Sequence, residues 1–409
     1  MVRCSLLAVS AALHTDEVGV RALELVRAAL GHDQFEVITE VGEASPTEPL
    51  AVLVVTGGTE HQVLDAWRQR AEVAAGEPLV LIAHPDHNSL PAALEALARL
   101  RAEGARARIA SISHDGDGSD LRSALHDAST WHRLHRARLG LVGEPSDWLV
   151  ASVPDPDLVR RRWGVEVVSV PLAPVLDRFD ENIAAPLATP VQLAARPHDH
   201  APHPADIETA ARFEPVLRGV VRDERLDAVA VRCFDLISRS HTSGCLALSA
   251  LNDAGTIAGC EGDLATTLAM LWVRELTGRQ PWMANPAAVD RTTGVLELAH
   301  CTVALSMVEG FRLDTHFESN LGVGITGELP PGPVTVVRLG GQELDQLWCE
   351  DGTALLTNPR PERCRTQLDV RVWPEAAAHL LDHPLGNHLV VVYGHHAAHL
   401  RAWWQEMIA

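Results

Sequence analysis

The stretch Ala51-Val52-Leu53-Val54-Val55-Thr56-Gly57-Gly58-Thr59 joins an apolar run to a glycine-containing loop. A short, continuously apolar run is typical of a strand buried on both faces, which is the environment of a parallel sheet. Loops that directly follow such strands are where open α/β sheets place their ligands. This loop has no Walker lysine and is not GxGxxG, so it favours a tight turn over a nucleotide site.

Similar apolar runs recur on both sides of this stretch, and helical patterns separate them. The alternation predicts a parallel sheet with right-handed helical crossovers, and hence an α/β N-terminal domain over residues 1–138. The expected strands are Cys4–Val9, Phe35–Ile38, Ala51–Val55, Leu79–Ala83 and Ala107–Ile112, and the expected helices are Val18–Leu30, His61–Ala75, Leu90–Ala102 and Leu121–Arg136.

Two further domains are expected downstream. A strand-to-loop transition at Leu139–Gly143 starts a second α/β domain over residues 139–290, which carries the helix of the candidate site. Beyond it, strand-like runs alternate with Gly/Pro turns, which predicts a mostly antiparallel β domain over residues 291–409. The fold class is therefore two open parallel-sheet domains, Rossmann- or flavodoxin-like, followed by a β-rich domain. The expected elements include helices Ala205–Val221 and Leu264–Leu276, and strands Val165–Val170, Ala228–Phe234, Val295–Leu298, Val334–Leu339, Gln367–Val372 and His388–Tyr393.

Composition excludes several classes of partner. The chain has 54 acidic against 34 basic residues, for a net charge of −20. That balance disfavours nucleic acid and anionic membranes, which require clustered Lys and Arg. The cysteines number seven and form no CxxC pair, so we expect free thiols in a reducing compartment. No apolar run approaches the length of a membrane span. We therefore expect a soluble cytoplasmic protein that acts on a small molecule.

The motif Cys260-Glu261-Gly262-Asp263-Leu264 opens the helix expected at Leu264–Leu276. Asp263 is suited to cap that helix, which requires no further function. Glu261 has no capping duty, and its apolar surroundings call for a partner, because a buried carboxylate needs a cation or hydrogen bonds. We interpret Glu261 as a metal ligand or an acid–base group, with a structural salt bridge as the alternative.

Histidines supply the remaining candidates. His300 and His388 each border an apolar strand, where a histidine is either a satisfied core residue or a ligand. The run His316-Phe317-Glu318-Ser319-Asn320 leads into a glycine-rich loop. Its imidazole, hydroxyl, amide and carboxylate groups suit a polyol-like ligand, although the same residues also make ordinary turns.

These motifs together resemble the L-fucose/L-arabinose isomerase superfamily, in a shorter branch related to fucose isomerase. The resemblance covers most of the second and third expected domains, while the first matches mainly in its layout. The matching segments are Leu226-Asp227, Cys233-Phe234-Asp235, Cys260-Glu261-Gly262-Asp263, Trp282-Met283-Ala284-Asn285, Leu298-Ala299-His300-Cys301 and Pro384-Leu385-Gly386-Asn387-His388.

The resemblance implies an aldose–ketose isomerase that binds a divalent metal, most often Mn²⁺, and works through an enediol. By position, the metal ligands of the family correspond to Glu261, Asn285 and His388, and His300 matches a histidine that binds metal in the arabinose branch. The expected catalytic residues are Glu261, Glu318 and His300, and the expected substrate-binding residues are His316, Ser319 and Asn320. Relatives are commonly trimers or hexamers, so a homo-oligomer is expected.

Asn285 departs from the family pattern, which has a carboxylate there. An amide oxygen can bind a hard cation, but it carries no charge and cannot exchange a proton near neutral pH. Three outcomes stay open: Glu318 or Asp290 moves the proton, a metal-dependent lyase or epimerase uses an enolate, or a non-catalytic protein on this fold binds a sugar.

Overall fold

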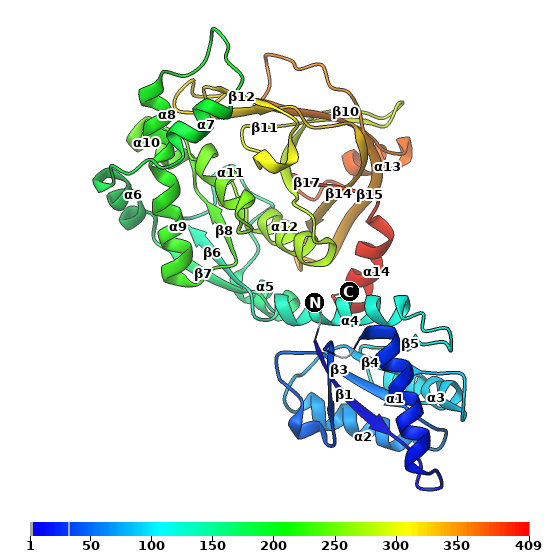
Figure 1. Ribbon diagram of the computed structural model, residues 1–409. Coiled ribbons are helices and arrows are strands. Elements are labelled where there is room, and N and C mark those ends of the chain that lie inside the picture. The colour runs from blue at the N-terminus through cyan, green and yellow to red at the C-terminus, as the bar shows by residue number, and fades with distance from the viewer. Residues whose placement is uncertain (1–2, 32, 409) are drawn as a thin grey trace. The chain divides into compact units, whose positions relative to one another are not determined.

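The computed structural model describes residues 3–31 and 33–408 and divides the chain into two compact units (Figure 1). The first comprises the chain up to residue 134 together with residues 405–407, and the second comprises residues 135–404 together with residue 408. The expected boundaries after residues 138 and 290 stay predictions.

The first unit is built on a parallel sheet with strand order β2-β1-β3-β4-β5, the flavodoxin-like order. Helices α2 and α3 pack on one face, and α1 and α4 pack on the other. The loop Thr56–Thr59 follows β3 and makes a turn in which Gly58 has φ +79°. The elements are β1 Cys4–Val9, α1 Asp16–Leu30, β2 Phe35–Ile38, β3 Leu50–Val54, α2 Glu60–Ala71, β4 Leu79–Ala83, α3 Ser89–Ala102, β5 Ala107–Ser111 and α4 Ser119–Leu134, with a 3₁₀ turn at Val41–Glu43.

The second unit begins with a smaller parallel sheet of order β7-β6-β8-β9. The single helix expected at Ala205–Val221 is instead two helices, which are separated at Arg212. The strand expected over Ala228–Phe234 ends at Val231, and Phe234 starts a helix. The elements are β6 Arg138–Val142, α5 Pro156–Trp163, β7 Glu166–Val170, α6 Leu172–Glu181, α7 Ala188–Ala194, α8 Pro204–Ala211, α9 Phe213–Glu224, β8 Ala228–Val231, α10 Phe234–Ser240, α11 Cys245–Asp253, β9 Ile257–Gly259 and α12 Leu264–Thr277.

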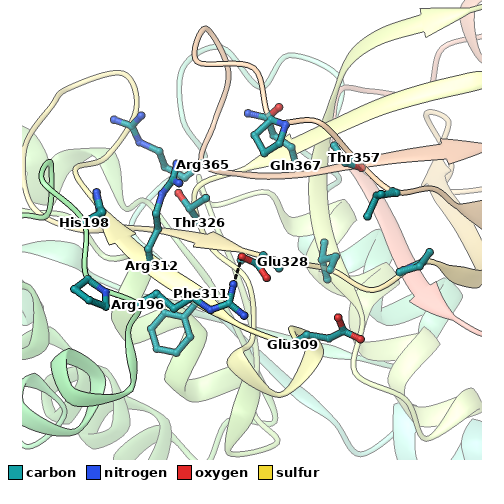
Figure 2. Close-up of a pocket in the computed structure, with 16 residues that line it drawn as sticks. Arg196, His198, Glu309, Phe311, Arg312, Thr326, Glu328, Thr357, Arg365 and Gln367 are labelled. Atoms are coloured by element: carbon teal, nitrogen blue, oxygen red, sulfur yellow. Dashed lines mark hydrogen bonds and ion pairs between the residues drawn. The ribbon is translucent and has the colours of Figure 1, made fainter.

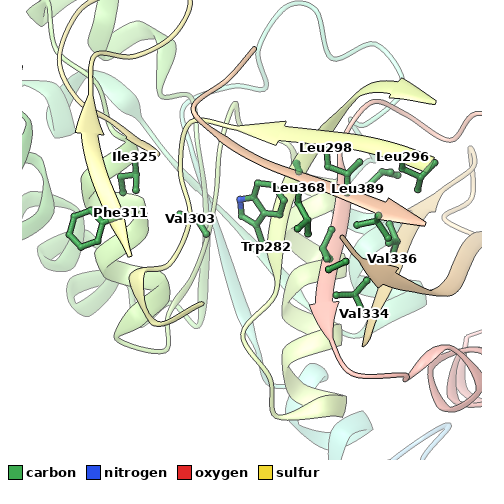
Figure 3. Packing of buried hydrophobic residues seen from close by; sticks show 14 of the residues in the cluster. Trp282, Leu296, Leu298, Val303, Phe311, Ile325, Val334, Val336, Leu368 and Leu389 are labelled. Carbon is green, nitrogen blue, oxygen red and sulfur yellow. The ribbon is translucent and has the colours of Figure 1, made fainter. Parts of the chain in front are cut away.

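The rest of this unit is a closed antiparallel barrel of order β10-β11-β16-β15-β14-β17, so the prediction of an antiparallel β region is confirmed. Large apolar side chains from these strands and the β12–β13 hairpin form one core, part of which Figure 3 shows. The elements are β10 Trp282–Asp290, β11 Val295–His300, β12 Phe311–Asp314, β13 Gly324–Gly327, β14 Gly332–Gly340, β15 Gln346–Ala354, β16 Thr366–Arg371, α13 Pro374–Asp382, β17 Leu389–Tyr393 and α14 Ala397–Met407, with a 3₁₀ turn at Leu305–Met307.

Helix α12 links the two sheets of the second unit. It contacts β8 and β9 of the parallel sheet, and it contacts β10, β14 and β17 of the barrel. Its amino-terminal end therefore brings the loop after β9 to the rim of the barrel. Within the described residues, no helix combines the length and the apolarity that crossing a membrane requires.

Candidate metal centre

Two consecutive residues with left-handed backbone conformation form the loop between β9 and α12. Glu261 has φ +64° and Gly262 has φ +67°. A Cβ at Gly262 would lie 2.9 Å from Glu144 O and from Pro145 Cα, so only glycine fits there. A non-glycine residue such as Glu261 is strained in this region, and strain of this kind concentrates at functional sites. The Glu261 carbonyl accepts a 2.8 Å hydrogen bond from Ser146 N, which helps to hold the strained turn.

Asp263 has two roles. Its Oδ1 caps α12 by accepting from Thr266 N at 2.8 Å, as its position before the helix predicts. Its Oδ2 lies 2.8 Å from Nδ1 of His388, at the other end of the second unit's sequence. Both side chains are fully buried. Burial disfavours the charged form of Asp263, but the hydrogen bond and charge of His388, the charge of Arg338 and the Thr266 N–H together outweigh it and lower the pKa of the carboxyl.

His388 precedes β17 and presents a free ring nitrogen to the loop after β9. Its Nε2 has no hydrogen-bond partner among the described residues and lies 3.4 Å from Glu261 Oε1. Burial alone lowers the pKa of His388, but Asp263 and Glu261 outweigh it and raise the pKa to about 9. With Nδ1–H donating to Asp263, Nε2 faces Glu261. It carries a proton below about pH 9 and offers a lone pair once a cation displaces that proton, and the Asp263 contact is how metal-binding histidines are usually held.

His300 ends β11, and its ring meets that of His388 edge to face with centroids 5.7 Å apart. Burial, followed by the charge of His388, lowers the pKa of His300 to about 3, so this imidazole is neutral at physiological pH. Its Nδ1 accepts a long 3.4 Å bond from Thr302 N. That bond places the ring proton on Nε2, so His300 is a hydrogen-bond donor in this tautomer and a ligand only if the bond is given up.

Glu261, His300 and His388 each offer a ligand atom, and these atoms lie within 4.8 Å of one another. All three residues are buried. One carboxylate and two imidazoles are a mixed N/O donor set that suits Mn²⁺, Fe²⁺, Co²⁺ or Zn²⁺. An orphaned Nε2 facing a buried carboxylate also fits a cation between them. The residues therefore fit a divalent metal.

Asn285 lies next to this cluster. Its neighbour Ala284 pairs with Leu389, and continuing that register by one residue places Asn285 opposite His388. A bulge follows directly, between Pro286 and Ala288. Asn285 Oδ1 accepts a 3.4 Å bond from Asn387 Nδ2. Asp290, the other acid considered from the sequence, instead accepts from Thr292 N and Thr293 N at the β10–β11 turn.

A row of aromatic rings stands beside Glu261. Trp148 donates its indole N–H to Glu261 Oε2 over 2.6 Å. Its ring meets Phe234 edge to face at 4.9 Å, and Phe234 meets His316 in the same way at 5.4 Å. Trp148 is half exposed, at 52%. The row therefore combines a solvent-facing indole with polar groups, an arrangement that suits both the C–H face and the hydroxyls of a sugar.

The segment after β12 contributes polar groups to the same region. Burial and the charge of Arg365 lower the pKa of His316 to about 4, and the negative charge of Glu261 opposes this shift. His316 Nδ1 lies 3.1 Å from Ser319 Oγ. Glu318 is largely exposed, and partial burial together with the negative charge of Glu261 raises its pKa. Asn320 is exposed, has φ +53° and donates its N–H to the His316 carbonyl, so it shapes the turn.

Two residues and one contact of this site could not be foreseen from the sequence analysis. Trp148 follows β6 in a loop at the carboxyl edge of the sheet, and a tryptophan in such a loop is a usable signal. Arg338 interrupts an apolar strand, which marks a buried charge in need of partners. Nothing in the sequence indicated the contact between Asp263 and His388, because helix capping already accounts for an aspartate at that position.

A separate cavity of about 500 Å³ opens beside the β12–β13 hairpin (Figure 2). None of the site residues expected from the sequence lines it. Its arginines already have partners: Arg196 pairs with Glu328, Arg312 pairs with Asp314, and Arg365 donates to Thr315. This cavity therefore gives no independent indication of a ligand.

Comparison with known proteins gives partial matches to enzymes named sulfoquinovose isomerase. The chain is 28% identical over 142 residues to the one from Alkalicoccus urumqiensis, which covers 33% of this chain and 32% of that protein. It is 23% identical over 268 residues to the one from Clostridium sp. (strain MSTE9), with 60% of each chain covered. The matches thus span about a third to three fifths of these relatives. No family model matches the chain.

Proposed function

We propose that this protein is a metal-dependent isomerase that interconverts the aldose and ketose forms of a sugar or sugar-like hydroxycarbonyl compound. The observation that carries the proposal is the orphaned, buried Nε2 of His388, aimed at Glu261 and fixed from behind by Asp263. The sugar isomerases to which the chain is similar support the same reaction class. Glu261 and His388, with Asn285 beside them, would hold the ion, for which Mn²⁺ is the first choice.

A bound divalent ion supplies Lewis acidity toward a carbonyl and an adjacent hydroxyl oxygen. The residues of the chain supply the rest. Glu318 takes the C2 proton of the aldose, exchanges it with solvent and delivers a proton to C1 of the resulting enediol, because its raised pKa brings the carboxylate closer to working pH. Neutral His300 relays the second proton through its Nε2, giving one to O1 as the enediol forms and taking one from O2 as the ketose forms, and Glu261 is held in place by Trp148. The aromatic row packs against the sugar and keeps water from that side.

One observation favours a second candidate, a sugar-binding protein without turnover. The donor cluster contains a single carboxylate, and Asn285 beside it cannot exchange a proton. With an amide at residue 285, the protein would bind a divalent ion more weakly and would lack one proton carrier. It would then bind a sugar without converting it.

Hydrogen exchange at C2 separates these candidates. The purified protein, loaded with Mn²⁺, is incubated in D₂O with sulfoquinovose and with a panel of unmodified aldoses, and the products are followed by NMR. We expect a ketose that carries deuterium at C1. Sugar binding without exchange would replace the isomerase with the binding protein, and cleavage or epimer products would indicate a lyase or epimerase. Glu261→Gln serves as the inactive control.

A further inference from the structure

Arg338 lies in β14 beneath the segment that leads to His388, and it is 1% exposed. All five of its N–H donors are used. Nε and Nη2 donate to Leu385 O at 3.0 and 2.9 Å, and Nη2 also donates to Ser152 Oγ at 2.6 Å. Nη1 donates to His388 O at 3.0 Å and to Thr266 Oγ1. The guanidinium therefore fixes the backbone on which His388 is carried.

The bond from Arg338 determines which way the Thr266 hydroxyl donates its proton. A guanidinium only donates, so the Thr266 hydroxyl must accept from Arg338 and has its own proton left to give. That proton goes to Asp263 Oδ2, which lies 2.8 Å from Thr266 Oγ1. Asp263 Oδ2 is also the acceptor of His388 Nδ1–H. The bonds therefore converge on Asp263 Oδ2, which accepts from the Thr266 hydroxyl on one side and from His388 Nδ1–H on the other.

The charge of Arg338 also favours Asp263 as a hydrogen-bond acceptor. Arg338 Nη1 lies 3.8 Å from Asp263 Oδ2, and both side chains are almost completely buried. A buried carboxylate without a compensating cation is costly, so Arg338 favours the ionised, accepting form of Asp263. The neighbouring backbone is adapted to this arginine, because a Cβ at Gly386 would overlap Nη2 of Arg338.

We propose that Arg338 is a positioning residue for the metal centre: it holds Thr266 as a donor to Asp263 and keeps Asp263 an ionised acceptor, so that His388 donates Nδ1–H to Asp263 and presents Nε2 to a divalent cation. It acts through Thr266 and Asp263 and through the His388 carbonyl, and it touches neither cation nor substrate. The inference rests on the proposed metal centre.

Calorimetric titration of the full-length protein with Mn²⁺ tests this role. Arg338→Lys keeps the charge but cannot serve all five acceptor contacts, and Thr266→Val removes the relay hydroxyl at nearly constant volume. We expect each to weaken Mn²⁺ binding by about 10- to 100-fold. Thr266→Ser keeps the hydroxyl and should bind as the wild type does. Thr267→Val is the matched control, because that buried hydroxyl donates to the Asp263 backbone carbonyl and not to its carboxylate.

The double variant Arg338→Lys/Thr266→Val distinguishes positioning from general destabilisation. If Arg338 acts in part through Thr266, the double variant should lose less affinity than the sum of the two single losses. Additive losses, or single variants that bind within about twofold of the wild type, would overturn the inference while leaving the metal centre intact. A folded wild-type protein that binds no Mn²⁺ would overturn both. Thr266→Val alone decides the matter if Arg338→Lys does not fold.

Discussion

Trp148 donates its indole N–H to Glu261 Oε2 across 2.6 Å, although 113 positions separate the two residues in the sequence. The bond occupies one carboxylate oxygen and leaves Oε1 facing Nε2 of His388. Because the Glu261 backbone already has positive φ, both its backbone and its side chain are held in one orientation. Glu261 is therefore preorganised to offer a single oxygen to a cation.

Trp148→Phe tests that orientation. Phenylalanine keeps the edge contact with Phe234 but has no N–H donor, and a hydrogen bond to a charged group contributes about 1.5–3 kcal/mol. We expect kcat/KM to fall by about 10- to 100-fold, which corresponds to that range. The melting temperature should hardly change, because Trp148 is half exposed. Trp373→Phe, at an indole that is 73% exposed before α13, is the control. Unchanged kcat/KM in Trp148→Phe would show that the bond is incidental.

Glu261→Gln should abolish activity and leave the melting curve nearly intact, because the amide oxygen can still accept from Trp148. The carboxylate's charge is lost, so Mn²⁺ affinity should fall as well. Loss of a proton carrier or ligand at such a site costs on the order of 10²–10⁴ in rate. Steady-state assays and thermal unfolding on the same preparation check both expectations. A large drop in stability with full activity per folded molecule would make Glu261 a structural residue.

The parallel layer of the first unit followed closely from its sequence. Strands β1 and β4 begin and end where their apolar runs do, because burial on both faces leaves no polar position inside the strand. The second unit was harder. Strand β9 is only Ile257–Gly259, too short for any periodic signal, yet it determines where the Glu261 loop begins.

The site could be predicted only where a side chain lacked a local explanation. Glu261 was identified because capping did not account for it, whereas Asp263 was assigned to its cap alone. Its contact with His388 is set by the packing of α12 against β17, which is a tertiary relationship that no local pattern encodes. The closure of the barrel likewise depends on the pairing of β14 with both β15 and β17.

Metal binding should depend on pH through His388. Without metal its pKa is raised to about 9, so Nε2 is protonated below that pH and a cation must displace the proton. Mn²⁺ affinity should therefore rise about tenfold per pH unit between pH 7 and 8 and level off above about 9. Calorimetry in buffers of different ionisation enthalpy should detect close to one proton released per ion. A pH-independent affinity would mean that His388 is not a ligand.

Stability of the metal-free protein should respond in the opposite sense. The folded pKa of His388 lies above its unfolded value near 6.5, so its contribution to stability is fully present below pH 6.5 and is lost as pH rises through about 9. The melting temperature of metal-free protein should fall over that window. His388→Gln should remove this component. If the wild type and this variant show the same pH dependence, another group is responsible.

His300→Asn separates a ligand from a hydrogen-bond donor. The bond from Thr302 N to Nδ1 places the proton on Nε2, so we expect His300 to polarise the substrate. The variant should keep Mn²⁺ affinity within a few-fold while kcat falls by on the order of 10². Metal titration and single-turnover rates measure the two effects separately. A collapse of Mn²⁺ affinity with normal folding would instead identify His300 as a ligand.

Asn285→Asp addresses the departure that most limits the proposed chemistry. The register of β10 on β17 brings residue 285 opposite His388, so a carboxylate there would add a negative charge beside the cation. We expect Mn²⁺ affinity to rise by about tenfold or more, since an anionic oxygen interacts more strongly with a dication than an amide oxygen does. Asn387→Asp is the matched control, because Asn387 bonds to Asn285 but is exposed. If the two variants strengthen binding equally, the gain reflects general electrostatics and Asn285 is not a ligand.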